Sequence, residues 1–181
     1  MGEIKSTLDL VMEKTRHLTL SQEEKKVQKR IEVNRRLQGL LQKYQDNLLK
    51  KEILKKELDN LKIAYDLNVD EMLADLLLNS LKLGRDNTLF LELLSEIFGL
   101  NLSGLETIFQ NFKAAVKSAS EERVDQIKTD LSKKRFISGS AVVPNLESDR
   151  EWLSMLGHIM DGHDQILNKE KAALTKELSL D

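Results

Sequence analysis

The chain contains 181 residues, and its composition limits the chemistry available to it. It has no cysteine, which excludes a disulfide scaffold, a thiolate nucleophile and any cysteine-ligated metal site. Aromatic residues make up only 4% of the chain, so the core must be largely aliphatic, and this favours an all-α fold. Charged residues reach 32% yet nearly cancel to a net charge of −2, as is typical of solvated helix faces.

The first two predicted elements are helices. An apolar stripe predicts a short helix over 1–20, and Ser21 with Glu24 forms a capping box that begins a long helix over 21–66. Apolar residues recur along this long helix about every 3.5 residues, which is the period of a coiled-coil seam. We expect the seam to pack against other helices, and its candidate interaction residues are Leu37, Leu41, Leu48, Leu54 and Leu58.

Residues 67–100 are predicted to form an apolar cap of short helices. Asn68 with Glu71 gives a second capping signal, and Gly84 and Gly99 end the two helical patterns. The segment between them, TLFLELLSEIF, is apolar around most of its circumference, which is typical of a buried helix.

The remaining predicted elements are a return helix over 103–135, a loop over 136–147 and a C-terminal helix over 148–179. Pro144, the only proline, marks the loop as extended. Together the elements predict one domain over 1–181, an elongated antiparallel helical bundle with coiled-coil-like long helices and a short-helix apolar cap. Capping signals of the S-x-x-E type begin the last two helices: Ser103 with Glu106, and Ser148 with Glu151.

Charge is distributed unevenly along this predicted bundle. The count of basic minus acidic residues is +5 over 1–64, −6 over 65–112, +3 over 113–136 and −4 over 137–181. In the predicted topology the basic start of the long helix over 21–66 lies near the basic end of the return helix, and the acidic cap lies at the opposite end. Such a dipolar rod can steer partners or set head-to-tail order. The alternative interpretation is an ordinary solvated helix surface.

Four residues near the middle of the last helix are the candidate metal ligands. Imidazole and carboxylate groups suit zinc, manganese or iron, and side chains three or four residues apart share a helix face. The alternative is that these histidines only pack or face solvent, since no further ligands occur at set intervals. The candidates are His158, Asp161, His163 and Asp164.

Four basic residues recur every seven positions along the predicted long helix and form a column that can follow phosphates. No aromatic residues interleave them for stacking on bases, and acidic neighbours dilute their charge, so nucleic acid is less favoured as a partner. The basic column consists of Lys29, Arg36, Lys43 and Lys50.

The sequence therefore favours a non-enzymatic helical protein that acts as an adaptor or assembly protein and associates with itself or with another helical protein. No cofactor is expected. The alternatives are a metal-dependent hydrolase that uses the His158–Asp164 cluster, and a nucleic-acid-associated protein that uses the basic column. We expect a cytoplasmic location without a membrane span, because no apolar stretch is long enough and the first residues lack a signal-peptide core.

Overall fold

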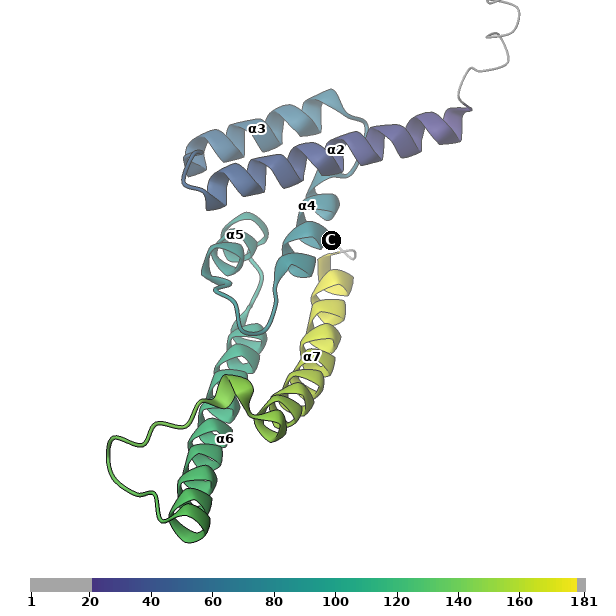
Figure 1. Ribbon diagram of the computed structural model, residues 1–181. Coiled ribbons are helices and arrows are strands. Elements are labelled where there is room, and N and C mark those ends of the chain that lie inside the picture. Colours follow the sequence, from purple (N-terminus) through teal and green to yellow (C-terminus); the bar gives the residue numbers. More distant parts are fainter. Residues whose placement is uncertain (1–20, 179–181) are drawn as a thin grey trace, which may run out of the picture. The chain divides into compact units, whose positions relative to one another are not determined.

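The computed structural model of the protein describes residues 21–178, and this part of the chain contains six α-helices, one 3-10 helix and no strand (Figure 1). The predicted all-α class is therefore confirmed, while the predicted helix over 1–20 lies outside the described residues. The helices are α2 (Gln22–Gln45), α3 (Lys51–Ala64), α4 (Val69–Ser80), α5 (Thr88–Phe98), α6 (Ser103–Arg135), η2 (Leu146–Ser148) and α7 (Arg150–Leu178).

The contacts within the chain define two compact units, 1–73 and 74–181, and α4 crosses the boundary between them. The assignment of a single domain stays a prediction. None of the helices between residues 21 and 178 combines the length and the apolar character needed to cross a membrane.

In the first unit, α2 and α3 pack against each other as a helical hairpin (Figure 1). The predicted continuous helix over 21–66 is therefore wrong, because α2 ends at Gln45 and α3 begins at Lys51. Between them Asn47 takes a left-handed backbone conformation with φ of 56°, which asparagine tolerates better than most residues. The turn allows the two halves of one apolar repeat to cover each other within the same chain.

Each helix of the hairpin contributes one buried stripe. The stripe of α2 consists of Val33, Leu37 and Leu41, and that of α3 consists of Leu54, Leu58 and Leu61. By contrast, Leu48 lies in the turn with 76% of its surface exposed. The repeat that predicts packing between separate long helices thus supplies the core of a hairpin.

Side chains fix both ends of this hairpin. The predicted capping box is confirmed: the Glu24 N–H donates to Ser21 Oγ at 3.1 Å, and the Ser21 N–H donates to Glu24 Oε2 at 2.7 Å. After the end of α3, the Tyr65 hydroxyl donates to Glu32 Oε1 of α2 at 2.7 Å. Arg36 lies over the Tyr65 ring, 5.6 Å from its centroid, and pairs with the same carboxylate. These contacts tie the last residues of the hairpin to the middle of α2.

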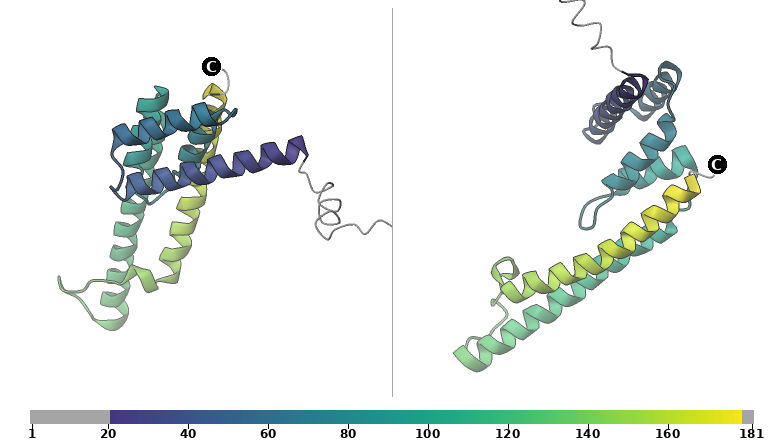
Figure 2. Two further views of the ribbon diagram at one scale, coloured as in Figure 1. Left: turned by 90° about the horizontal axis from the view of Figure 1, so that it is seen from above. Right: turned by 90° about the vertical axis from the view of Figure 1, so that its right-hand side faces the viewer.

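In the second unit, α6 and α7 pack side by side along their length (Figure 2). The predicted return helix over 103–135 matches the bounds of α6, and the predicted last helix over 148–179 begins two residues early. The two short helices expected within 67–100 are confirmed as α4 and α5.

The predicted caps have mixed outcomes. Asn68 accepts from the Glu71 N–H at 3.1 Å, as expected. The other two signals are wrong, because a neighbouring residue provides the side-chain oxygen in each case. Asn101 accepts from the N–H of Ser103, and Asp149 accepts from the N–H of Trp152.

Arg123 and Asp149 fix where α7 starts along α6. The guanidinium donates from Nε and Nη2 to the two carboxylate oxygens, at 3.0 and 2.8 Å, and both side chains are less than 20% exposed. Because Asp149 directly precedes α7, α7 starts beside Arg123. The last twelve residues of α6 therefore extend about 18 Å beyond the start of α7.

The other end of α6 lies near α4 and α5, where the second unit has most of its core. Asn87 is 6% exposed and organises the connection between the two short helices, since its amide donates to the Lys82 and Arg85 carbonyls and accepts from the Lys82 N–H. Only Leu93 and Leu94 of α5 are fully buried. The expectation that α5 is buried all round is thus met in part, and its remaining face borders a pocket. The core residues include Leu77, Leu78, Leu81, Leu105, Ile108 and Phe112.

Candidate functional site

The end of α6 and the loop after it expose apolar side chains together with basic ones. Phe136 is 91% exposed, Val143 is 85% exposed and Ile137 is 48% exposed. The three preceding residues, Lys133, Lys134 and Arg135, are also exposed. These six residues are called the α6 tip below. Because exposed large apolar side chains often mark interaction sites, the α6 tip is a candidate docking element.

Phe136 is held in a backbone conformation that bulky residues rarely adopt. Its φ is 57°, in the left-handed region, and its N–H donates to Ser132 O at 3.2 Å. Glycine is the usual residue at this position after a helix, and a side chain there costs about 1 kcal/mol. The left-handed backbone and the exposed ring of Phe136 both cost free energy in a chain without a partner. Because such costs tend to persist at functional sites, Phe136 is a candidate for a role in binding.

The electrostatic field at the α6 tip is positive. Between residues 128 and 135 there are four basic residues and one acidic residue, Asp130. Lys134 Nζ lies 2.8 Å from Asp130 Oδ2, and this hydrogen bond lowers the pKa of the Asp130 carboxyl. The carboxylate therefore stays ionised and offsets Lys134, whereas Lys133 and Arg135 form no ion pair within the described part of the chain.

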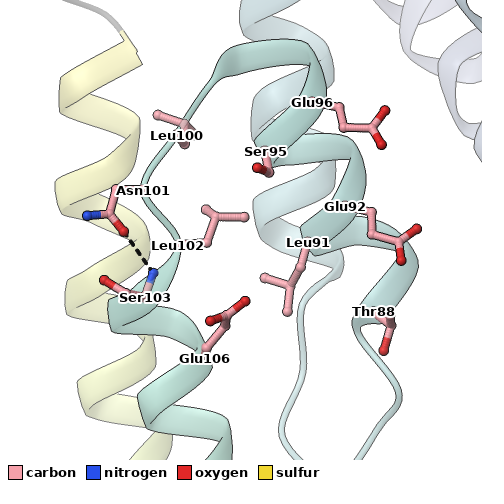
Figure 3. Close-up of a pocket in the computed structure, with 10 residues that line it drawn as sticks. All are labelled: Thr88, Leu91, Glu92, Ser95, Glu96, Leu100, Asn101, Leu102, Ser103 and Glu106. Atoms are coloured by element: carbon pink, nitrogen blue, oxygen red, sulfur yellow. Dashed lines mark hydrogen bonds between the residues drawn. The ribbon is translucent and has the colours of Figure 1, made fainter.

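A pocket of about 680 Å³ lies at the opposite end of α6, between α5 and the start of α6 (Figure 3). Leu91 and Leu102 point toward one another across it, and Leu100 adds further apolar surface. This volume lies within the range of pockets that bind ligand groups. The pocket is therefore large enough to accept an aromatic side chain and its neighbours.

The polar lining of this pocket is acidic. Glu92 and Glu96 come from α5, and Glu106 extends from the first turns of α6 into the space below Leu91 (Figure 3). Among residues 21–178, those that line it include no lysine, arginine or histidine. Thr88, Ser95, Asn101 and Ser103 complete the lining. We call this site, lined by these ten residues, the acidic pocket.

The α6 tip and the acidic pocket lie at opposite ends of one helix. Ser103 and Glu106 belong to the pocket, and Arg135 belongs to the tip. The 33 residues of α6 correspond to about 50 Å at 1.5 Å per residue. Acidic and basic side chains therefore lie at opposite ends of α6, while the dipolar rod expected for the whole bundle stays a prediction.

The predicted interaction residues of the seam differ in how far they are buried. Leu37, Leu41, Leu54 and Leu58 are at most 5% exposed, so they are already covered in a single chain. Only Leu48 is exposed, in the turn between α2 and α3. Their role in binding another chain stays a prediction.

The four candidate metal ligands are not brought together. His163 is half-buried, its Nδ1 lies 2.9 Å from Ile159 O, and its ring makes an edge contact with Phe112 at 5.6 Å. His158 and Asp161 are exposed, and Asp164 borders a different pocket next to Lys171. The part of the chain that the structure describes has no group of three such side chains that could hold a metal ion.

The basic column is interrupted by the turn after α2. Lys29, Arg36 and Lys43 are exposed on α2, whereas Lys50 precedes α3 on the other side of the turn. Arg36 is also engaged by Glu32 and Tyr65. Three positions of the column therefore share a helix, and one of them is already paired.

The sequence contained a signal for the α6 tip, since three basic residues are followed by Phe136 and Ile137 in a segment rich in serine and glycine. It contained none for the acidic pocket, because Leu91, Leu100 and Leu102 are indistinguishable from core leucines in a periodic pattern. No protein-family model matches this chain, and neither does any curated protein or solved structure with which it was compared. The case for a function therefore depends on the residues of the chain itself.

Proposed function

We propose that this chain is an elongated helical bundle that works as a non-enzymatic interaction protein and associates with itself through the α6 tip. The observation that carries the proposal is the exposure of Phe136, at 91%, directly after three basic residues, and of Val143, at 85%, in the loop that follows. Apolar side chains in such a position gain free energy only when a partner covers them.

The shape of the second unit supports this role. The α6 tip lies on a helix that extends about 18 Å past the Arg123–Asp149 contact, so a partner can reach it without displacing α7. Within the loop, the Val142 N–H donates to Gly139 O at 3.2 Å, which closes a turn next to Val143. A loop organised in this way loses less conformational entropy when it binds than an unstructured one.

The two alternative functions have less support. His163 already contacts Ile159 O and Phe112, so it is not positioned with His158 for a shared ligand. The basic column loses its regular spacing at the turn before Lys50. Neither observation favours hydrolysis or nucleic-acid binding over self-association.

The experiment is sedimentation equilibrium of the full chain over a wide range of concentrations. We expect the average mass of the wild type to rise with concentration, and the variant Phe136→Ser/Val143→Ser to stay close to the 20.7 kDa of one chain. The matched control is Ile63→Ser, because Ile63 is an 86% exposed apolar residue on α3 and does not belong to the α6 tip.

Two results would contradict the proposal. One is a wild type that remains monomeric at every concentration. The other is a tip variant that associates as strongly as the Ile63→Ser control, which would assign self-association to another surface.

A further inference from the structure

We infer that the pocket between the α4–α5 connection and α7 binds a small organic molecule through its phosphate group. The connection covers residues 81–87, and the pocket has a volume of about 450 Å³. We call this site the basic pocket. All its lining residues belong to the second unit, and the inference goes beyond the self-association proposed for the α6 tip.

The charged side chains of the basic pocket are mostly cationic. Lys82 and Arg85 come from the connection and Lys171 comes from α7, whereas Asp164 is the only acidic residue among the described residues that line it. Three positive charges against one negative charge leave an excess of two. Lys82 and Arg85 form no ion pair within residues 21–178. A phosphate monoester, which carries nearly two negative charges at neutral pH, matches this excess.

A buried amide fixes the two basic residues of the connection. The amide nitrogen of Asn87, a residue that is 6% exposed, donates to the carbonyl oxygens of Lys82 at 2.9 Å and of Arg85 at 3.3 Å. Its Oδ1 accepts from the Lys82 N–H at 3.1 Å. Between them Gly84 has a φ of 71°, which lets the backbone turn. Because this backbone is already ordered, a ligand that binds to it loses less conformational entropy.

Lys171 is joined to the same connection from α7. Its Nζ donates to Leu81 O at 2.6 Å, and the residue is half-buried. Burial lowers the pKa of Lys171, and nearby Asp164 raises this pKa while nearby Lys82 lowers it further. An ammonium group can donate three hydrogen bonds, so it can bind a phosphate oxygen and keep its bond to Leu81. Two ammonium groups that repel each other are stabilised by a shared anion.

The volume and the uncharged lining favour a phosphate attached to an organic group over free phosphate. A space of about 450 Å³ is within the range of small-molecule sites, and a phosphate group fills only a small part of it. Asn79 and Asn168 add exposed amides that can donate and accept hydrogen bonds, and Met160, which is 37% exposed, adds apolar surface. This combination suits a polyhydroxylated phosphate monoester such as a sugar phosphate.

The test is a titration of the full chain, labelled with nitrogen-15, with ribose 5-phosphate. Amide NMR signals are followed in about 0.15 M salt, which screens weak contacts with exposed charges. We expect saturable shifts in the signals of residues 81–87 and of Lys171. Ribose should cause none, because it lacks the phosphate. Inorganic phosphate should bind more weakly than ribose 5-phosphate, because it leaves most of the pocket empty.

A pair of matched variants locates the site. Lys82→Gln/Arg85→Gln removes two of the three cations and keeps the hydrogen bonds of Asn87, since these reach only main-chain atoms. We expect its dissociation constant for ribose 5-phosphate to rise about tenfold or more. Lys113→Gln/Lys128→Gln removes the same charge from exposed positions of α6 outside the lining, and it should bind like the wild type. Far-UV circular dichroism checks that both variants keep their helix content.

Three results would overturn the inference. The first is a wild type whose signals from residues 81–87 show no saturable shift with ribose 5-phosphate. The second is an equal dissociation constant for Lys82→Gln/Arg85→Gln and for its charge control, which would exclude the basic pocket as the site. The third is inorganic phosphate that binds as tightly as ribose 5-phosphate, which would exclude an organic ligand. All three leave the proposal for the α6 tip unaffected, because they concern different residues.

Discussion

Arg123 of α6 holds Asp149 with two hydrogen bonds, and the same carboxylate accepts from the Trp152 N–H at the start of α7. The hydrogen bonds from Arg123, followed by the one from Trp152, lower the pKa of Asp149 below its ordinary value. One carboxylate therefore both caps a helix and fixes its position along the neighbouring helix.

This relationship predicts a specific loss of stability in acid. A carboxyl whose pKa is lower in the folded state stabilises the fold fully above its unfolded pKa, and the contribution disappears as pH falls through the folded pKa. We expect the difference in unfolding temperature between the wild type and Asp149→Asn to shrink between about pH 5 and pH 2. A difference that is constant over this range would show that ionisation of Asp149 does not stabilise the fold.

A second prediction concerns the strain at Phe136. Because its φ is 57°, replacement by glycine should stabilise the chain by about 1 kcal/mol in chemical denaturation. The same Phe136→Gly variant should associate more weakly than the wild type. Destabilisation by a similar amount would instead mean that the ring contributes to packing within one chain.

A third prediction concerns Tyr65. Its hydrogen bond to Glu32 raises the pKa of the phenol above its ordinary value of 10.0 and lowers that of the carboxyl. The chain has two tyrosines, so Tyr44→Phe leaves Tyr65 as the only phenol visible in an ultraviolet titration. We expect its midpoint to lie above that of a free tyrosine.

The control for this titration is Glu32→Gln in the Tyr44→Phe background. It removes the negative acceptor, so the midpoint should fall toward the ordinary value. Identical midpoints with and without Glu32 would exclude the contact between the end of α3 and α2 in solution.

A fourth prediction compares two leucines of the same apolar repeat. Leu37 is fully buried in α2, whereas Leu48 is 76% exposed in the turn. Leu37→Ala should lower the free energy of unfolding by about 3 kcal/mol, and Leu48→Ala should change it by less than about 0.5 kcal/mol. Chemical denaturation measures both, and equal effects would contradict the hairpin.

The sequence predicts which residues of the first unit are buried better than it predicts the path of the chain. Leu37 and Leu54 belong to one repeat of about 3.5 residues, and the repeat continues in phase across the turn at 46–50. Neither proline nor glycine interrupts it there, so only Asn47 indicated a left-handed turn. A helix that folds back and one that continues have the same local pattern, and the choice between them depends on tertiary burial.

The second unit was more predictable because its boundaries coincide with strong local signals. Gly99 ends α5 in the left-handed conformation, and Pro144 lies in the loop before α7. The acidic pocket could not be predicted, since it exists only because Leu91 and Leu102 lie on opposite sides of a gap between two helices. Such a gap depends on side-chain geometry that no periodic pattern contains.

The Arg123–Asp149 contact also affects whether α6 and α7 stay together when the backbone between them is cut. The α6–α7 pair is held by packing along both helices and by this contact, so the connection over 136–145 adds covalent linkage but little of the interface. Trypsin cleaves after lysine and arginine, and Lys133, Lys134 and Arg135 are exposed just before that connection. A cut there should leave two fragments that co-purify and unfold together, and the same segment should accept an inserted domain without separating the helices.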